Sequence, residues 1–307
     1  MCVTYVRGAS VGYTRRQHLD AMESEDGMHR ILWLALLAVI SVAATSDLAS
    51  SQQPGADVTN RAATQIGEHS GSKIWVGRYQ QFEEFLRTAE IERTASVSTG
   101  VLGIKRAYFK PGSLAGSAAL RSIRPGRYDG FWESYKGDLA AYKLDRLLDL
   151  DMVPPTVERR YNGDMVSVQL WAEDMKMLSE VQKQNLRPAN LEPYNFQLRR
   201  QKVFHNLVGN IDPNQGNILF DPAWNVILID FSRAFTNTQT LKFEATSIDR
   251  MFLDRIKALD RATLKQEIGE LVVESGGVDA LLARRDLIVR AFDKLAKLKG
   301  ASQVFLP

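Results

Sequence analysis

Apolar residues recur every three or four positions in several segments after residue 73, which is the spacing of one face of a helix. The first of these segments covers residues 74–91. A second covers residues 133–153 and ends at Pro154-Pro155, a pair that cannot continue a helix. Further helical patterns cover three later segments, residues 194–210, 259–275 and 278–300. The chain after residue 235 is therefore predicted to be largely helical.

Segments with the pattern of β-strands lie mostly before residue 174. Residues 95–112 are predicted to form β-structure with a turn at Gly100 and Gly103, and residues 117–123 to form another strand. Residues 124–133 are predicted to be a loop. Asn162-Gly163 is a strong turn dipeptide, so residues 156–174 should form a hairpin.

This order of elements predicts an α+β protein with two lobes. The first lobe, residues 74–172, would be rich in β-structure with one long helix, and the second, residues 173–307, would be mostly helical. Residues 51–73 are small and polar without an apolar period, which indicates a linker.

The segment that precedes the linker has the layout of a secretory signal. Met28 is followed by Arg30, by an apolar run over residues 31–40, and by small residues through Ala44. We expect residues 28–50 to be a signal peptide or an uncleaved N-terminal anchor, and residues 1–27 to be an upstream extension that is not native. The protein would then be periplasmic, secreted or membrane-anchored. If the run were a core helix instead, a cytoplasmic location would follow.

Composition is that of a globular protein. The 307 residues are 45% hydrophobic and 24% charged, and the formal net charge is +3 without a basic run, which argues against nucleic-acid binding. Cys2 is the single cysteine, so the chain can form neither an internal disulfide nor a cysteine-based zinc site.

The clearest chemical signal is the stretch NIDPNQGNILFDPAWNVILIDFSRAF, residues 210–235. Asp212 and Asn217 are five positions apart, and Asp230 follows Asn217 by thirteen, the length of a β-hairpin that returns the chain to its start. Carboxylate and amide oxygens suit Mg²⁺ or Mn²⁺ that also holds phosphate oxygens. Asp212 would stand apart from that metal and accept a proton from an attacking hydroxyl, a division of roles that phosphoryl transfer requires.

D-x-x-x-x-N followed by a hairpin and Ile-Asp-Phe resembles the catalytic and metal-binding segments of the protein kinase-like superfamily. The resemblance is greatest to its atypical branch: lipid kinases of the phosphatidylinositol 3-/4-kinase type, related bacterial toxin kinases and secretory-pathway kinases. Residues 134–160 also resemble a segment of the bacterial members. The resemblance implies that Asp212 is the catalytic base and that Asn217 and Asp230 are the metal ligands.

The same resemblance implies a lysine for the α- and β-phosphates, paired with an acid on the long helix. Asp138 occupies the position of that acid. Lys110 suits the chemistry but lies 28 residues before Asp138, whereas Arg121 lies at the more usual distance of 17 residues. We prefer Lys110 slightly on chemical grounds. Trp171, at the expected hinge, would either line an adenine pocket or belong to the core.

The resemblance therefore implies a kinase that uses ATP and Mg²⁺ or Mn²⁺ to phosphorylate a hydroxyl group of a protein, lipid or small molecule. The alternatives are a pseudokinase that acts as a nucleotide-binding or scaffold module, and an AMP transferase on the same fold. His205, on an apolar helix before Asp212, is interpreted as a packed or capping residue.

Overall fold

The computed structural model describes residues 73–97 and 104–307. The predicted upstream extension, the signal or anchor and the linker up to residue 72 lie outside the described residues. Within that part of the chain, no helix has both the length and the apolar character needed to cross a bilayer. The described helices are α1 (Tyr79–Thr88), α2 (Lys136–Leu148), α3 (Leu178–Lys183), α4 (Leu191–Val208), α5 (Arg250–Ala258), α6 (Arg261–Val272), α7 (Gly277–Lys299) and α8 (Ala301–Val304).

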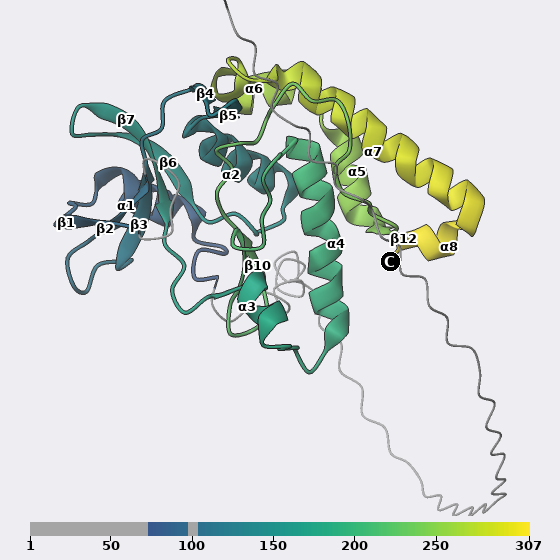
Figure 1. Cartoon of the computed structure of the whole chain (residues 1–307), viewed down its shortest axis with the longest axis horizontal. Coiled ribbons are helices and arrows are strands. Elements are labelled where there is room, and N and C mark those ends of the chain that lie inside the picture. Colours follow the sequence, from purple (N-terminus) through teal and green to yellow (C-terminus); the bar gives the residue numbers. More distant parts are fainter. Residues whose placement is uncertain (1–72, 98–103) are drawn as a thin grey trace, which may run out of the picture. The chain divides into compact units, whose positions relative to one another are not determined.

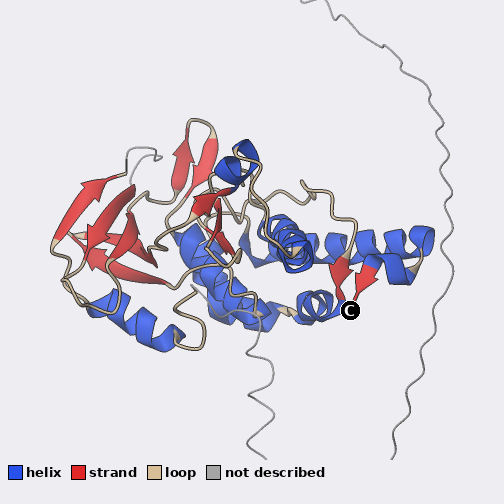
Figure 2. Cartoon of the chain, turned by 90° about the horizontal axis from the view of Figure 1, so that it is seen from below, coloured by secondary structure: helices blue, strands red, loops and turns tan. Residues whose placement is uncertain are grey.

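A five-stranded antiparallel sheet forms the first part of the described chain (Figure 2). Its strand order is β1 (Arg93–Ser96), β2 (Ile104–Tyr108), β3 (Ser117–Arg121), β7 (Asp164–Leu170) and β6 (Thr156–Tyr161). Asn162 and Gly163 connect β6 to β7 with φ values of 48° and 89°, the left-handed conformation that a tight hairpin turn requires. The predicted hairpin is confirmed. The turn expected at Gly100 and Gly103 lies outside the described residues.

Helices α1 and α2 both contact the β6–β7 hairpin. α1 buries Phe82 and Leu86 completely in the core of the sheet-rich part. α2 ends at Asp149, whose left-handed φ of 51° terminates the helix before Pro154-Pro155. The two helices predicted from apolar spacing in this half are therefore present, with shorter bounds.

The second part is helical and has its own core. Helices α4, α5 and α6 all contact α7 (Figure 1), and their apolar faces enclose a cluster that includes Leu207, Phe231, Phe252 and Leu281. Three short strands of this part form a second antiparallel sheet: β8 (Lys176–Met177), β9 (Ile218–Phe220) and β10 (Val226–Leu228). A sheet-rich part followed by a helical part confirms the predicted α+β class.

The structure differs from the sequence prediction in residues 124–133, which form a hairpin of β4 (Gly126–Tyr128) and β5 (Phe131–Glu133) and are not a loop. Each strand is too short to show alternation, although Asp129-Gly130 is a turn dipeptide and has left-handed φ values of 49° and 84°. The short elements α3, α5 and β8 were also not predicted, nor was the pair β11 (Ile248–Asp249) and β12 (Phe305–Leu306).

One residue of the predicted linker lies within the described chain, and residues 51–72 lie outside it. That residue, Lys73, is buried and donates a hydrogen bond to the Asp151 carbonyl at 2.6 Å.

Candidate active site

The β9–β10 hairpin brings Asn217 and Asp230 together. The two strands pair in register from Ile218 opposite Leu228, and the Ile229 amide donates to the Asn217 carbonyl at 3.1 Å. Asn217 therefore immediately precedes one strand, and Asp230 follows the other by two residues. This is the juxtaposition that the length of the segment predicts.

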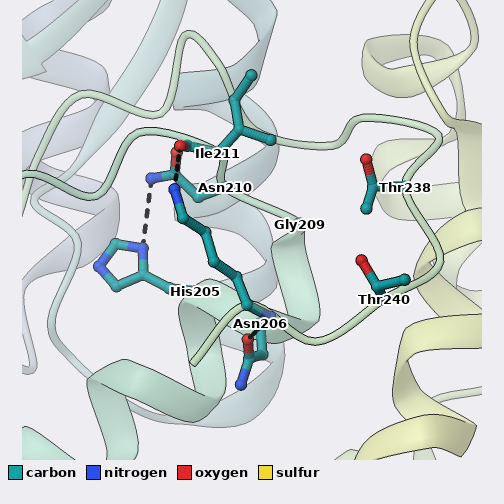
Figure 3. A pocket seen from close by; sticks show the side chains of 8 residues that line it. His205, Asn206, Gly209, Asn210, Ile211, Thr238 and Thr240 are labelled. Atoms are coloured by element: carbon teal, nitrogen blue, oxygen red, sulfur yellow. Dashed lines mark hydrogen bonds between the residues drawn. The ribbon is translucent and has the colours of Figure 1, made fainter. Parts of the chain in front are cut away.

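Asp212 lies in a loop that is fixed by its own side chains. Helix α4 ends at Gly209, which has a left-handed φ of 59°. The Asn210 carboxamide then accepts a hydrogen bond from the Asp212 amide at 3.0 Å, and its nitrogen lies 3.3 Å from His205 Nδ1 (Figure 3). The side-chain Nδ2 of Asn217 donates to the Asp212 carbonyl at 3.5 Å, which connects the loop to the hairpin.

His205 is a packed residue, as predicted. It is 1% exposed, and its ring stacks on Phe231 at a centroid distance of 5.6 Å. Burial lowers the pKa of His205 to about 3, so the ring is neutral near pH 7. Its contact with Asn210 supports the loop that carries Asp212. Beside this loop lies a cavity of about 170 Å³ that is lined by the end of α4 and by Thr238, Thr240 and Lys242 (Figure 3).

The segment after β10 is fixed against α2. Asp230 has a left-handed φ of 60°, and the Phe231 amide that follows donates to Asp138 Oδ1 at 2.8 Å. Gly137 allows this close approach, because a Cβ atom at that position would lie 2.2 Å from the Phe231 carbonyl oxygen. Asp138 therefore determines where the Asp230 backbone lies.

Arg121, at the end of β3, connects the two carboxylates. Its Nε donates to Asp138 Oδ2 at 2.8 Å, and its Nη2 lies 2.8 Å from Asp230 Oδ1. Ser167 also donates to Asp138 Oδ2, at 3.2 Å. The remaining nitrogen of Arg121, Nη1, is buried and has no hydrogen-bond partner among the described residues. One arginine thus joins strand β3, helix α2 and the Asp230 segment and has one donor left over.

Burial of this cluster disfavours the charged forms of Arg121 and Asp138. Burial lowers the pKa of Arg121, but the charges of Asp138 and Asp230 outweigh that effect, and the net shift is upward. The guanidinium therefore stays charged. Burial raises the pKa of Asp138, and the Arg121 charge opposes that rise.

The structure does not bring Lys110 into this cluster. Lys110 lies two residues beyond β2, its side chain is 60% exposed, and it pairs with Glu90 at 2.6 Å. The ion pair with Asp138 is made by Arg121, so the slight preference for Lys110 has no support in the geometry.

Trp171 follows the last residue of β7, and its amide donates to the Ser117 carbonyl at 3.2 Å. The Arg106 guanidinium lies 4.3 Å from the centre of its ring. Trp171 thus sits at the junction between the two parts of the described chain, and a role beside an adenine stays a prediction.

Two residues that the sequence did not suggest complete the site. Arg233 Nη1 donates to Asp212 Oδ2 at 3.0 Å, while its Nε and Nη2 donate to Glu133 Oε1 at 2.9 and 2.6 Å. Glu133 lies in the hairpin that was predicted to be a loop. Arg233 lies three residues after Asp230, within IDFSRAF, and this nearness to a predicted metal ligand is the sequence feature that could have identified it.

The oxygen atoms available to a cation are few. In the described ranges, no three His, Cys, Asp or Glu side chains cluster in a way that could hold a metal. Asp230 Oδ1 accepts a hydrogen bond from Ser232 at 2.9 Å and forms an ion pair with Arg121, whereas none of the described donors hydrogen-bonds to Asp230 Oδ2 or Asn217 Oδ1. One carboxylate oxygen and one amide oxygen fit a hard divalent cation that takes its other ligands from phosphate and water.

Comparison with known proteins places the fold. No protein-family model matches the chain, and no curated protein sequence matches it. Among solved structures, the Golgi casein kinase aligns over 74% of this chain and 78% of its own, with a TM-score of 0.54 and 13% identity, and its complex with Mn and ADP aligns equally well. Hydra Fam20 with sugar aligns over 74% of this chain and 92% of its own, with a TM-score of 0.57 and 15% identity. The chain therefore has a fold similar to that of the Golgi casein kinase and of hydra Fam20.

Proposed function

We propose that this chain is an ATP-dependent phosphotransferase that moves the γ-phosphoryl group to a hydroxyl acceptor and uses Mg²⁺ or Mn²⁺. The observation that carries the proposal is the convergence of Asp212, Asn217 and Asp230 beside Arg121, a buried cation with an unpaired donor. Phosphoryl transfer depends mainly on positioning of the reactants and on neutralisation of phosphate charge. A base, a pair of metal ligands and a cation that binds phosphate can supply both.

The unpaired donor supports a phosphate contact. A buried N–H without an acceptor costs about 1–3 kcal/mol, and Arg121 Nη1 is such a donor within the described chain. A phosphate oxygen of the nucleotide would satisfy it with a charge-assisted hydrogen bond. Arg121, and not Lys110, would then bind the α- and β-phosphates.

Asp230 Oδ2 and Asn217 Oδ1 are the oxygens that would hold the cation. When bound, the cation neutralises charge on the β- and γ-phosphates as the phosphoryl group leaves. The complex of the Golgi casein kinase with Mn and ADP supports the choice of cofactor, because its fold is similar.

Asp212 is the proposed general base. Its side chain is 41% exposed, so an acceptor hydroxyl can approach it from solvent. The carboxylate would accept the hydroxyl proton while the acceptor oxygen forms a bond to the γ-phosphorus. The bond from the γ-phosphorus to the bridging oxygen would break, and ADP would leave with that oxygen.

The acceptor class stays open between protein, lipid and small molecule. The finer likeness to phosphatidylinositol 3-/4-kinase-type and bacterial toxin kinases belongs to this proposal and rests on the motif of residues 212–231. Export or membrane anchoring through residues 28–50 likewise rests on the sequence pattern.

A pseudokinase is the second candidate, because the polar groups of the site already bind one another. Arg121 donates to both Asp138 and Asp230, and Asp212 accepts from Arg233. Such a protein would bind nucleotide without turnover. An AMP transferase would instead leave an adenylyl group on its acceptor, which mass spectrometry distinguishes from a phosphoryl group.

The test combines calorimetric titration of ATP, with Mg²⁺, with Mn²⁺ and with chelator, and an ATP-consumption assay. The parent should bind nucleotide with a metal and consume ATP. Asp230→Ala should sharply weaken metal-dependent nucleotide binding. Asp212→Asn should leave binding intact and lower turnover by about 10²–10⁴, the range for a positioned acid–base group. Metal-dependent binding without turnover would favour the pseudokinase, and an Asp230→Ala variant that binds like the parent would refute both.

A further inference from the structure

Arg233 is held between two carboxylates that differ sharply in exposure. The Glu133 side chain is 3% exposed and lies at the end of β5, whereas the Asp212 side chain is 41% exposed. Arg233 itself is 23% exposed, and its guanidinium also lies 4.8 Å from the ring centre of Phe131. The pair thus connects a hairpin of the sheet-rich part to the loop that carries Asp212.

Glu133 is the fixed end of this connection. A buried carboxylate is costly unless it is paired, and Arg233 is its hydrogen-bonded partner among the described residues, through Oε1. Glu133 Oε2 is buried and has no partner in that part of the chain. If Arg233 moved away, Glu133 would be left as an uncompensated buried charge. Arg233 is therefore held by Glu133 and presents its Nη1 to Asp212.

The backbone strengthens the same connection. The Ile211 amide donates to the Arg233 carbonyl at 3.4 Å, so main chain and side chain of Arg233 both contact the loop next to Asp212. Burial lowers the pKa of Arg233, but Glu133 and Asp212 outweigh that effect and the net shift is upward. Arg233 is thus a permanent cation at a defined position.

Only one oxygen of Asp212 is engaged. Arg233 binds Oδ2, and none of the described donors hydrogen-bonds to Oδ1. A carboxylate held at one oxygen has its rotation restricted, and its other oxygen keeps its lone pairs for a proton. The geometry distinguishes an atom that is held from an atom that can react.

We propose that Glu133 and Arg233 form a positioning pair that orients the Asp212 carboxylate, so that Oδ1 faces the acceptor hydroxyl. The pair rests on the proposed function, in which Asp212 is the base. It acts through Asp212 and does not contact the nucleotide. Loss of the pair should therefore lower the rate of the transfer step without weakening nucleotide binding.

The experiment compares Arg233→Met and Arg233→Lys with the parent in steady-state ATP consumption and in calorimetric binding of Mn²⁺-ATP. Arg233→Met should lower kcat about tenfold to a thousandfold, as expected for loss of orientation, while the nucleotide Kd stays within about twofold of the parent value. Arg233→Lys should retain part of kcat, because it keeps the charge but cannot bind Glu133 and Asp212 with one planar group. Arg127→Met, on the same hairpin, is the control; Arg127 donates to the Gly130 carbonyl and should leave kcat unchanged.

Because Arg233→Met leaves Glu133 unpaired and could unfold, the double variant Glu133→Gln/Arg233→Met is made as well. It removes both charges, should fold, and should lose no more kcat than Arg233→Met alone. Guanidinium ion added to Arg233→Ala should restore part of kcat, a result that a purely structural role would not give.

The outcomes separate this proposal from the proposed function. If the parent consumes no ATP, the kinase function fails and the positioning pair fails with it. If the parent is active but the double variant keeps its kcat, only the pair is refuted. An increase in kcat on removing Arg233 would also refute it, since that would mean that Arg233 blocks the base.

Discussion

Removal of the Asp138 carboxylate should destabilise the fold more than removal of a surface carboxylate that makes the same kind of ion pair. In Asp138→Ala, Arg121 loses its Nε contact at 2.8 Å, and the Phe231 amide loses its acceptor at 2.8 Å. Arg121 is 5% exposed, so water does not replace the lost partner. The variant therefore leaves a buried cation with Asp230 as its remaining carboxylate partner.

The size of the effect follows from burial. Breaking a buried ion pair by removing one partner costs about 3–5 kcal/mol, a large share of the roughly 5–15 kcal/mol that stabilises a typical protein. The control is Asp164→Ala, which removes the partner of Arg124 in a pair whose side chains are 78% and 48% exposed. Water solvates both groups there, so the control should show almost no loss of stability.

The assay is equilibrium urea unfolding followed by circular dichroism at neutral pH, with parent, Asp138→Ala and Asp164→Ala measured in parallel. Arg121→Met/Asp138→Leu should recover part of the stability, because it removes the buried cation that has lost Asp138 as a partner and fills the space with apolar atoms. The reasoning is refuted if Asp138→Ala unfolds at the same urea concentration as Asp164→Ala, or if the double variant is less stable than Asp138→Ala.

Three further predictions concern nucleotide binding, pH and location. Arg121→Ala should weaken ATP binding at least about tenfold, roughly 1.4 kcal/mol. Lys110→Ala alters an exposed pair with Glu90 and should bind ATP like the parent in the same calorimetric titration. The opposite result, weaker binding by Lys110→Ala alone, would restore the Lys110 assignment. Because burial lowers the pKa of His205 from 6.5 to about 3, the unfolded chain takes up a proton that the folded chain does not. His205 should therefore cost the parent about 2 kcal/mol of stability as pH falls from about 6.5 to about 5, and urea unfolding of His205→Gln should lack that loss; equal slopes would contradict it. N-terminal sequencing and fractionation of the native protein should find a chain that begins near residues 44–50 or one held at a membrane, and full-length protein in the soluble cytoplasmic fraction would contradict export.

The parts of the site that could be predicted are local in sequence. Asn217 and Asp230 are joined by one hairpin, whose length alone brings its ends together. Asn162-Gly163 determines a turn by its own backbone preferences. In both cases the interactions that decide the structure lie within about twenty residues, so a pattern in the chain is sufficient evidence.

The parts that could not be predicted depend on contacts between distant segments. Glu133 and Arg233 are 100 residues apart, and no sequence pattern around one of them predicts its contact with the other. The choice between Lys110 and Arg121 depends on where each strand ends: β2 stops at Tyr108, so Lys110 falls in the turn that follows, whereas Arg121 is the last residue of β3. β3 lies between β2 and β7 in the sheet, and this central position buries Arg121 beside Asp138. Chemical suitability favoured the lysine, but strand pairing decides which side chain reaches the acid.

The charges of the site give a reason why its chemistry should depend on a metal. The Arg121 guanidinium pairs with two carboxylates, of Asp138 and Asp230, so the cluster around it has a formal net charge of one minus. A triphosphate brought next to such a cluster would be repelled, and the single unpaired donor of Arg121 is too little to offset that repulsion. A divalent cation on Asp230 and Asn217 would balance the charge and also attract the phosphates. Arg121 holds both acids in place but leaves this excess of negative charge, and the excess makes a bound cation a requirement for nucleotide binding under the proposed function.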